Sequence, residues 1–153
     1  MTLKIHVHYA IPRQSPNALP SRRELRTWVQ AALRDSSGSD GDGCEEITIR
    51  LATEEECREL NQRYRSKNDA SNVLAFPYAT EPYIEGDLLL CPSVVEQEAR
   101  TQAKTLSAHY AHLVVHGTLH LQGWDHQTPV DAEAMENREC EILAKLGYDD
   151  PYA

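Results

Sequence analysis

Apolar and polar residues alternate from Leu3 to Tyr9, where Leu, Ile, Val and Tyr alternate with Lys and His. A period of two residues places alternate side chains on opposite faces of a strand, so this segment predicts a half-buried strand. Similar alternation or a short apolar run predicts three further strands, at residues 46–52, 71–76 and 86–91. We expect Pro77 and Pro92 to end the last two strands, because proline has no N–H for the ladder.

Apolar residues spaced three and four apart predict five helices, at about residues 21–34, 53–64, 93–104, 107–122 and 129–146. The first opens with Ser21-Arg-Arg-Glu24, in which serine and glutamate can cap the helix start reciprocally. The same spacing recurs at 53–56 and 93–96, and Gly147 is expected as the C-terminal cap of the last helix. In the second helix we expect Cys57, Leu60 and Tyr64 to be buried.

The order of these elements predicts an α+β fold with a mixed four-stranded sheet and about five helices. Helices separate the first three strands, which favours parallel crossovers between them. The last two strands are joined by a short loop, which favours an antiparallel pair. At 153 residues the chain is expected to form a single domain over residues 1–153.

The composition is that of an ordinary globular chain, with 41% hydrophobic and 25% charged residues. The longest apolar runs are too short to span a membrane, and the N-terminal segment alternates where a signal peptide would be continuously apolar. We therefore expect a cytoplasmic protein with no membrane partner. Cys44, Cys57, Cys91 and Cys140 form no CxxC pair and are expected to be reduced, buried thiols.

Acidic residues outnumber basic ones, 24 to 15, which gives a net charge of −9. This balance opposes general binding to a phosphate backbone, which needs clustered Lys and Arg. An RNA substrate would need a local basic patch, and two short segments are candidates, at residues 22–26 and 58–67. Either segment could equally be a solvated helix face, and the acidic balance favours a protein-binding role alongside any catalysis.

The chemistry of the chain is concentrated in His116-Gly-Thr-Leu-His120-Leu-Gln-Gly123-Trp-Asp-His126. On a helix, His116 and His120 lie one turn apart on the same face. Gly123 then suits a left-handed turn that ends the helix and brings His126 back toward the pair. Three imidazoles with one open position suit a catalytic zinc or a related divalent ion.

His112 offers a competing pair, because it precedes His116 by four residues. His112 and His120 are separated by about 12 Å of helix rise, too far to share one ion. The turn places His126 nearer to His120, so we predict His116, His120 and His126 as the ligands.

The spacing is similar to H-E-x-x-H-x-x-G-x-x-H of the metzincin proteases, but Gly117 stands where those enzymes have their glutamate. That glutamate is the usual general base for a metal-activated water. Its absence argues against a peptidase of the standard mechanism.

The pattern H-G-x-L-H-L-x-G-x-D-H at residues 116–126 closely resembles the signature of the bacterial YbeY family of ribosomal RNA maturation factors and endoribonucleases. Residues 61–77, 86–92 and 146–152 also resemble the family. The resemblance implies the same fold and one zinc ion (Zn²⁺) per chain. It implies a zinc-dependent, single-strand endoribonuclease that matures the 3′ end of 16S rRNA and serves ribosome quality control. The implied partners are rRNA precursor, the small ribosomal subunit and its assembly proteins.

Four further residues are candidates for the site. The resemblance implies a functional role for Arg65, whose planar guanidinium could hold the scissile phosphate from a connecting loop. Ser71 and Asn72 could hydrogen-bond the substrate. Asp125 could orient an imidazole, cap a turn or accept a proton, and these alternatives stay open.

Two other functions remain candidates at this point. One is a non-enzymatic ribosome assembly factor with a structural metal, in which Cys91 or Asp125 fills the fourth position. The other is a metal hydrolase of a different bond, such as a peptide. Trp124, next to the third histidine, is expected in the core and could instead stack on a base.

Overall fold

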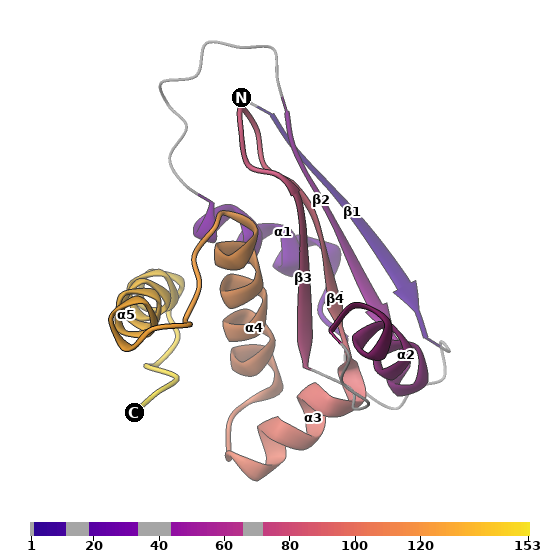
Figure 1. The fold of residues 1–153 in the computed structure, drawn as a ribbon. Coiled ribbons are helices and arrows are strands. Elements are labelled where there is room, and N and C mark those ends of the chain that lie inside the picture. Colours follow the sequence, from indigo (N-terminus) through magenta and orange to yellow (C-terminus); the bar gives the residue numbers. More distant parts are fainter. Residues whose placement is uncertain (1, 12–18, 34–43, 66–71) are drawn as a thin grey trace.

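The computed structural model of the chain describes residues 2–11, 19–33, 44–65 and 72–153 (Figure 1). Its strands are β1 (Thr2–Ala10), β2 (Cys44–Ala52), β3 (Val73–Ala79) and β4 (Glu85–Leu90). Its helices are α1 (Arg22–Ala32), α2 (Glu54–Arg65), α3 (Pro92–Thr101), α4 (Leu106–Leu121) and α5 (Pro129–Leu146). The predicted α+β fold with a mixed four-stranded sheet is confirmed.

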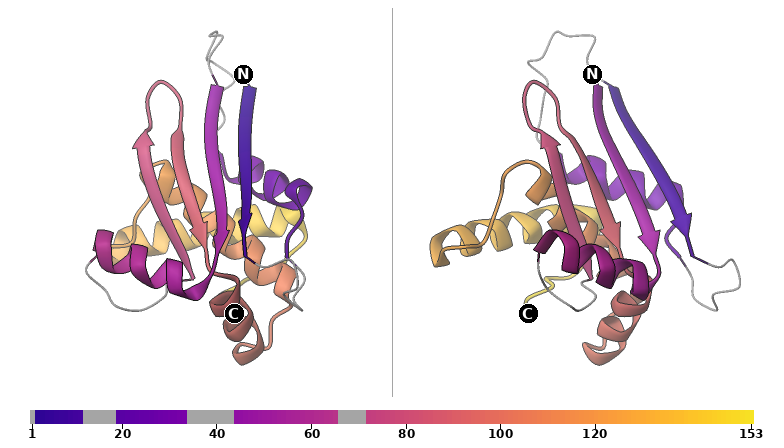
Figure 2. Two further views of the ribbon diagram at one scale, coloured as in Figure 1. Left: turned by 90° about the vertical axis from the view of Figure 1, so that its right-hand side faces the viewer. Right: turned by 45° about the vertical axis from the view of Figure 1, so that its right-hand side comes forward.

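The strand order is β1-β2-β4-β3, with β1, β2 and β4 parallel and β3 antiparallel at one edge. The antiparallel pairing of β3 with β4 was predicted correctly. The prediction that β3 runs parallel to β1 and β2 was wrong. Figure 2 shows the reason: α2 lies across the strands and does not run back along them. It therefore delivers the chain to the far edge at the same end of the sheet, from which β3 must run in the opposite direction.

Of the two prolines predicted to end strands, Pro92 follows the end of β4 at Leu90 as expected, but Pro77 does not end β3. β3 does not stop at Pro77 but continues through it to Ala79, with a bulge between these two residues. An edge strand tolerates this residue, because one side of its backbone has no ladder partner. The N-cap of α3 is Cys91, two residues before the predicted cap at Ser93. Pro92 begins the helix, since a fixed φ and a missing N–H suit the first helical position.

The capping box of α1 is present as predicted. The Glu24 N–H donates to Ser21 Oγ at 3.1 Å, and the Ser21 N–H donates to Glu24 Oε1 at 3.0 Å. At the start of α2 only half of the predicted box forms. The Glu56 N–H donates to Thr53 Oγ1, but the Glu56 carboxylate binds Arg50 and does not return to the cap.

The main core lies between the sheet and helices α1 and α4. Buried residues of β2 and β4 face these helices, as Ile49 and Leu88 illustrate with no exposed surface. In Figure 1, α4 stands between the sheet and α5. α4 is therefore covered along most of its length, and ten of its 16 residues are buried. Among the described residues, no helix has the length and apolarity needed to cross a membrane.

A smaller core lies on the opposite face of the sheet, where α2 packs. It contains Cys57, Leu74, Leu89 and Cys91. Tyr64, predicted to be buried, is 61% exposed because the last turn of α2 extends beyond this cluster. The four thiols form no disulfide, as expected, but Cys44 and Cys140 are only partly buried.

Candidate metal centre

α4 carries His116 and His120 on its last two turns. Thr105 caps the start of the helix by accepting a hydrogen bond from the Ala108 N–H at 3.1 Å. Near the other end, the Gln122 side chain donates to the Ala32 carbonyl of α1 at 2.7 Å. Both ends of the helix are thus anchored, and the packed body between them positions the two imidazoles.

A left-handed glycine ends this helix. Gly123 has φ +98°, so the predicted positive φ is confirmed. Its N–H donates to the His120 carbonyl at 3.0 Å, and the Trp124 N–H donates to the Leu119 carbonyl at 3.1 Å. These two bonds form a Schellman motif, which reverses the chain within three residues and returns His126 to the side of α4.

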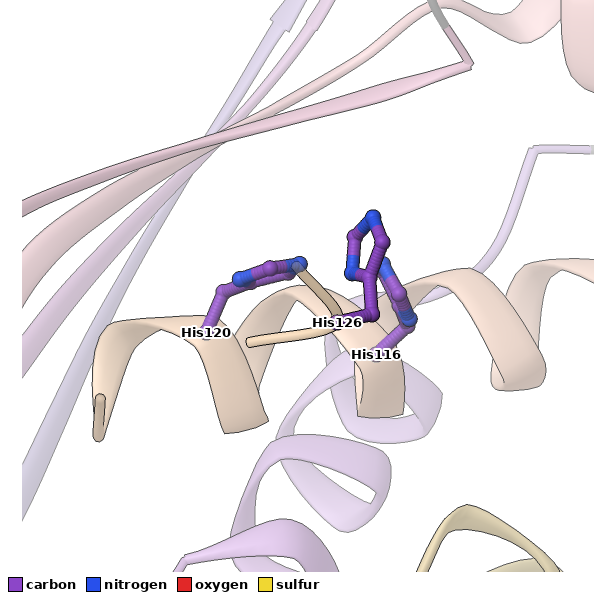
Figure 3. Close-up of side chains that lie close together, drawn as sticks. All are labelled: His116, His120 and His126. Carbon is purple, nitrogen blue, oxygen red and sulfur yellow. The ribbon is translucent and has the colours of Figure 1, made fainter. Parts of the chain in front are cut away.

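The three imidazoles converge, as Figure 3 shows. One ligand nitrogen from each of His116, His120 and His126 lies within 4.8 Å of the others. The ring centroids are 4.7 Å apart for His116 and His120, 5.1 Å for His120 and His126, and 5.6 Å for His116 and His126. This arrangement could hold one divalent ion between the rings.

The neutral state of His120 favours the binding of such an ion. Burial, together with the neighbouring His116 and His126, lowers the pKa of His120 to about 4. Its imidazole is therefore neutral at pH 7, with a lone pair free for a metal. A hydrogen bond to the backbone of Trp124 helps to hold the ring.

Glu139 of α5 stands behind the site, and the sequence analysis missed it. Its side chain has no exposed surface, and its Oε1 lies 2.8 Å from His116 Nδ1. Burial alone would raise the pKa of Glu139, but hydrogen bonds from His112, His116 and Tyr152 lower it to about 2. An ionised carboxylate fixes the proton of His116 on Nδ1 and leaves Nε2 as the ligand atom.

Two further groups satisfy this carboxylate. The Tyr152 hydroxyl donates to Glu139 Oε2 at 2.7 Å, and His112 Nε2 lies 3.2 Å from Oε1. His112 thus contacts Glu139, which supports the site, and is not one of the three converging histidines. The sequence analysis also placed His112 outside the ligand set. Glu139 was detectable in the sequence as a charged residue at i+4 from Met135 and i−3 from Ile142, on the buried stripe of α5.

Gly117 lies where α4 approaches the sheet most closely. A Cβ at this position would be 2.8 Å from Leu88 Cδ2 and 3.3 Å from Val73 Cγ2, both shorter than ordinary contacts. Any larger side chain at this position would have to displace Leu88, which is fully buried, so a glutamate here would disturb the packing of α4 on the sheet.

The triad lines a cleft of about 640 Å³ between α4 and the edge strand β3. Its other walls include Tyr64, Asn72, Ala75 and Phe76. Among the described residues, no carboxylate lines this cleft. A molecule bound there would meet imidazoles, backbone and aromatic rings.

The remaining candidates are placed as follows. Arg65 is the last residue of α2 and not part of a loop, because the helix extends one residue further than predicted; its side chain and Ser71 lie outside the described residues. Asn72 lines the cleft, and its amide donates to Glu98 Oε1 at 3.0 Å. The Asp125 carboxylate accepts the Gln127 N–H at 3.2 Å, so it caps a local turn.

Trp124 is 36% exposed, so the prediction of a core position was wrong: the Schellman turn directs this residue outward. The basic segments are largely engaged in the fold. Arg22 and Arg26 donate to β1 carbonyls, while Arg58 and Arg63 pair with glutamates one turn earlier in α2.

The fold and the site define an α+β protein with a histidine triad that could hold a metal ion. The model of the family described as endoribonuclease YbeY matches residues 12–147. The chain therefore belongs to the YbeY endoribonuclease family, as the histidine motif suggested.

Curated relatives agree over nearly the whole chain. The chain is 52% identical to endoribonuclease YbeY of Methylibium petroleiphilum, over 88% of this chain and 85% of that protein. It is 45% identical to the protein of the same name from Nitrosococcus oceani, over 99% and 98%. The solution structure of TM1509 from Thermotoga maritima has a similar fold, with a TM-score of 0.53 and 24% identity over 96% of this chain and 97% of that one.

Proposed function

We propose that the chain is a single-domain, zinc-dependent endoribonuclease of the cytoplasm that cleaves single-stranded RNA. Its substrate is ribosomal RNA precursor, cut during maturation of the 16S 3′ end and in ribosome quality control, in contact with the small subunit and its assembly proteins. The observation that carries this proposal is the triad itself: three converging imidazoles, supported from behind by Glu139 and open in front to a large cleft. Membership of the endoribonuclease YbeY family supports the choice of RNA.

The residues fit a zinc ion. His116 Nε2, with the nearest nitrogens of His120 and His126, would provide three neutral ligands, the number typical of catalytic zinc sites. When bound, such an ion supplies Lewis-acid polarisation of a phosphodiester and lowers the pKa of water. The Glu139 carboxylate holds the orientation and tautomer of His116 and lies too deep to touch the substrate.

Arg65, at the end of α2, is proposed to bind the scissile phosphate. Its helix delivers it toward the cleft wall formed by Tyr64, the preceding residue. A guanidinium keeps its charge at every relevant pH and matches two phosphate oxygens at once. No carboxylate lines the described part of the cleft, so we do not assign a protein carboxylate as the proton acceptor. Ser71 and Asn72 are proposed as further substrate contacts.

The two alternatives are less well supported. Peptide hydrolysis of the metzincin type needs a glutamate at the position of Gly117, where a side chain would collide with Leu88. A closed structural site needs a fourth protein ligand. Cys91 is buried in the smaller core between the sheet and α2, and Asp125 caps a turn. Within the described residues, the group that could hold an ion contains three histidines and nothing else.

The test is incubation of metal-loaded protein with a small-subunit rRNA precursor, with His116→Ala as the control and product ends mapped by sequencing. We expect specific cleavage by the wild type and loss of both metal and cleavage in the variant. Absence of cleavage by fully loaded wild type would favour the assembly factor. Cleavage that persists in metal-free His116→Ala would remove the triad from the reaction.

A further inference from the structure

A second cleft, of about 450 Å³, lies on the face of the sheet that α2 partly covers. Tyr64 of α2 and Phe76 and Tyr78 of β3 form its aromatic walls. Thr48 of the central strand β2 and His8 of the edge strand β1 contribute polar groups. Tyr64 and Tyr78 are 61% and 63% exposed. Both tyrosines therefore present most of their side-chain surface to a ligand in the cleft.

This second cleft adjoins the cleft lined by the histidine triad, here called the metal cleft. Tyr64 and Phe76 line both of them, with their rings edge to face and centroids 5.4 Å apart. β3, which lies between the two clefts, is an edge strand of the sheet. An extended ligand at the histidines can therefore pass over this edge and reach the second cleft without crossing the protein.

The charges of the second cleft favour a base over a phosphate. Its arginine, Arg50, is engaged by Glu56 through bonds of 2.6 Å and 2.9 Å. Its aspartate, Asp87, accepts a 2.6 Å hydrogen bond from the Tyr78 hydroxyl. Both charges are thus partnered, whereas a phosphate would require an uncommitted cation. Aromatic rings beside neutral polar groups suit a nucleobase, which stacks on a ring and hydrogen-bonds through its edge.

We propose that the second cleft binds the base of the nucleotide that follows or precedes the scissile phosphate, and that Tyr64 and Tyr78 stack on this base. The inference rests on the proposed endoribonuclease function, because it takes the metal cleft as the place of cleavage. It names a specificity subsite on the opposite side of the edge strand, where the RNA continues after leaving the histidines. On this path the RNA must bend around β3. A flexible single-stranded RNA can follow it, whereas a rigid duplex cannot.

The test uses a short single-stranded oligonucleotide with one cleavage position and versions in which either flanking nucleotide is abasic. For the metal-loaded wild type, we expect one abasic version to raise KM about 5-fold to 100-fold, the range for loss of one stacked base. Tyr78→Ala, which alters a residue of the second cleft alone, should raise KM similarly on the intact oligonucleotide, with metal content unchanged. Tyr78→Phe and Tyr64→Phe should retain most of the binding, because the ring remains.

The decisive measurement combines the Tyr78→Ala variant with the abasic oligonucleotide. If the ring and the base contact each other, the abasic substitution should have little further effect in Tyr78→Ala. Tyr83→Ala serves as the matched control, since Tyr83 lines neither cleft. Additive effects, or wild-type KM in both Tyr64→Ala and Tyr78→Ala, would overturn the subsite.

Failure of the subsite and failure of the proposed function are distinguishable. If cleavage depends on neither the tyrosines nor the flanking bases, the subsite proposal is rejected and the nuclease proposal stands. If the loaded wild type cleaves no RNA, the nuclease proposal fails. Fluorescence anisotropy with the labelled oligonucleotides then tests the base site by itself, and equal affinity for intact and abasic RNA would reject it.

Discussion

The Glu139 carboxylate of α5 accepts a 2.8 Å hydrogen bond from Nδ1 of His116 on α4. This bond joins two helices and fixes which nitrogen of His116 faces the other histidines. The carboxylate is completely buried, so it can remain charged only because its partners compensate for lost hydration. Tyr152 is one of these partners, so a hydrogen bond connects the last residues of the described chain to the support of the histidine triad.

We first predict that this support determines metal affinity. Glu139→Gln should weaken zinc binding about 10-fold to 100-fold, because an amide neither favours the Nδ1–H tautomer as strongly nor balances the ion's charge. Tyr152→Phe should have a smaller effect in the same direction, since one of three hydrogen bonds to the carboxylate is lost. Competition with a chelating dye measures both affinities.

Tyr148→Phe is the matched control for Tyr152→Phe. The Tyr148 hydroxyl bonds Ser107 at 3.0 Å and has no contact with Glu139 among the bonds of the described residues. Its removal should leave zinc affinity unchanged. Equal affinities in Tyr152→Phe and the wild type would show that the C-terminal segment does not support the site.

The second prediction concerns the choice of ligands. His116→Ala, His120→Ala and His126→Ala should each lower the zinc content of purified protein, while His112→Ala should retain close to one ion per chain. The reason is geometric: three of these rings converge, and His112 contacts Glu139 and Tyr152. Elemental analysis measures the content. Loss of zinc from His112→Ala together with full content in His126→Ala would show that the wrong triad was chosen.

The third prediction separates the turn from the ligands. Gly123→Val should destabilise the fold by about 1–2 kcal/mol through backbone strain alone, because φ is +98° and a Cβ would meet no atom within 4 Å. It should also weaken zinc binding by displacing His126. Gly147 has φ +94° and equally open surroundings, so Gly147→Val should cost similar stability without affecting zinc. Urea unfolding and zinc titration of both variants decide the point; a matching loss of zinc affinity in Gly147→Val would contradict it.

Much of this architecture was predictable because local signals determine it. The capping box at Ser21, the turn at Gly123 and the helical spacing of His116 and His120 depend on neighbours in sequence, and all three take the expected form. The family was also identifiable from the histidine motif.

Long-range relationships were not predictable in this way. The direction of β3 depends on how α2 crosses the sheet, which hydrophobic periodicity does not encode. The role of Glu139 depends on the packing of α5 against α4, because its partner His116 lies 23 residues away along the chain. A glutamate on an apolar stripe was a usable signal, but its partner could be known only from the tertiary packing.

The fourth prediction is a loss of stability at acidic pH in the metal-free protein. The pKa of His120 is lowered from 6.5 to about 4, so between these values the unfolded chain binds a proton that the folded chain does not. Stability should therefore fall as the pH drops through this interval. The pKa of Glu139 is lowered from 4.5 to about 2, so a further loss should follow below pH 4.5.

Urea unfolding of the metal-free wild type between pH 3 and pH 7 measures this dependence. Glu139→Gln should reduce the loss below about pH 4.5, because it removes the carboxyl titration. The loss above that value should remain, because burial is the main cause of the lowered pKa of His120. His120→Ala should reduce the loss between pH 6.5 and pH 4. Stability that rises as the pH falls through this interval would contradict the neutral state assigned to His120.

The last prediction separates cleavage from metal binding through Arg65. A protonated guanidinium has no lone pair for a metal, so Arg65→Ala should leave zinc content and folding intact while RNA cleavage falls. Losing one charge-assisted clamp typically costs about 3 kcal/mol, or on the order of a hundredfold in rate. Arg65→Lys should recover only part of the rate, because an ammonium keeps the charge but not the planar fork.

Arg63 provides the matched control on the same helix. It pairs with Glu59 at 3.5 Å on the exposed side of α2, so Arg63→Ala removes the same charge without removing the proposed clamp. If Arg65 acted only through the general field of α2, the two variants would lose cleavage equally, and raising the salt concentration would reduce both effects. A phosphate clamp instead predicts a large loss of kcat in Arg65→Ala alone. Unchanged cleavage in that variant would remove Arg65 from the mechanism.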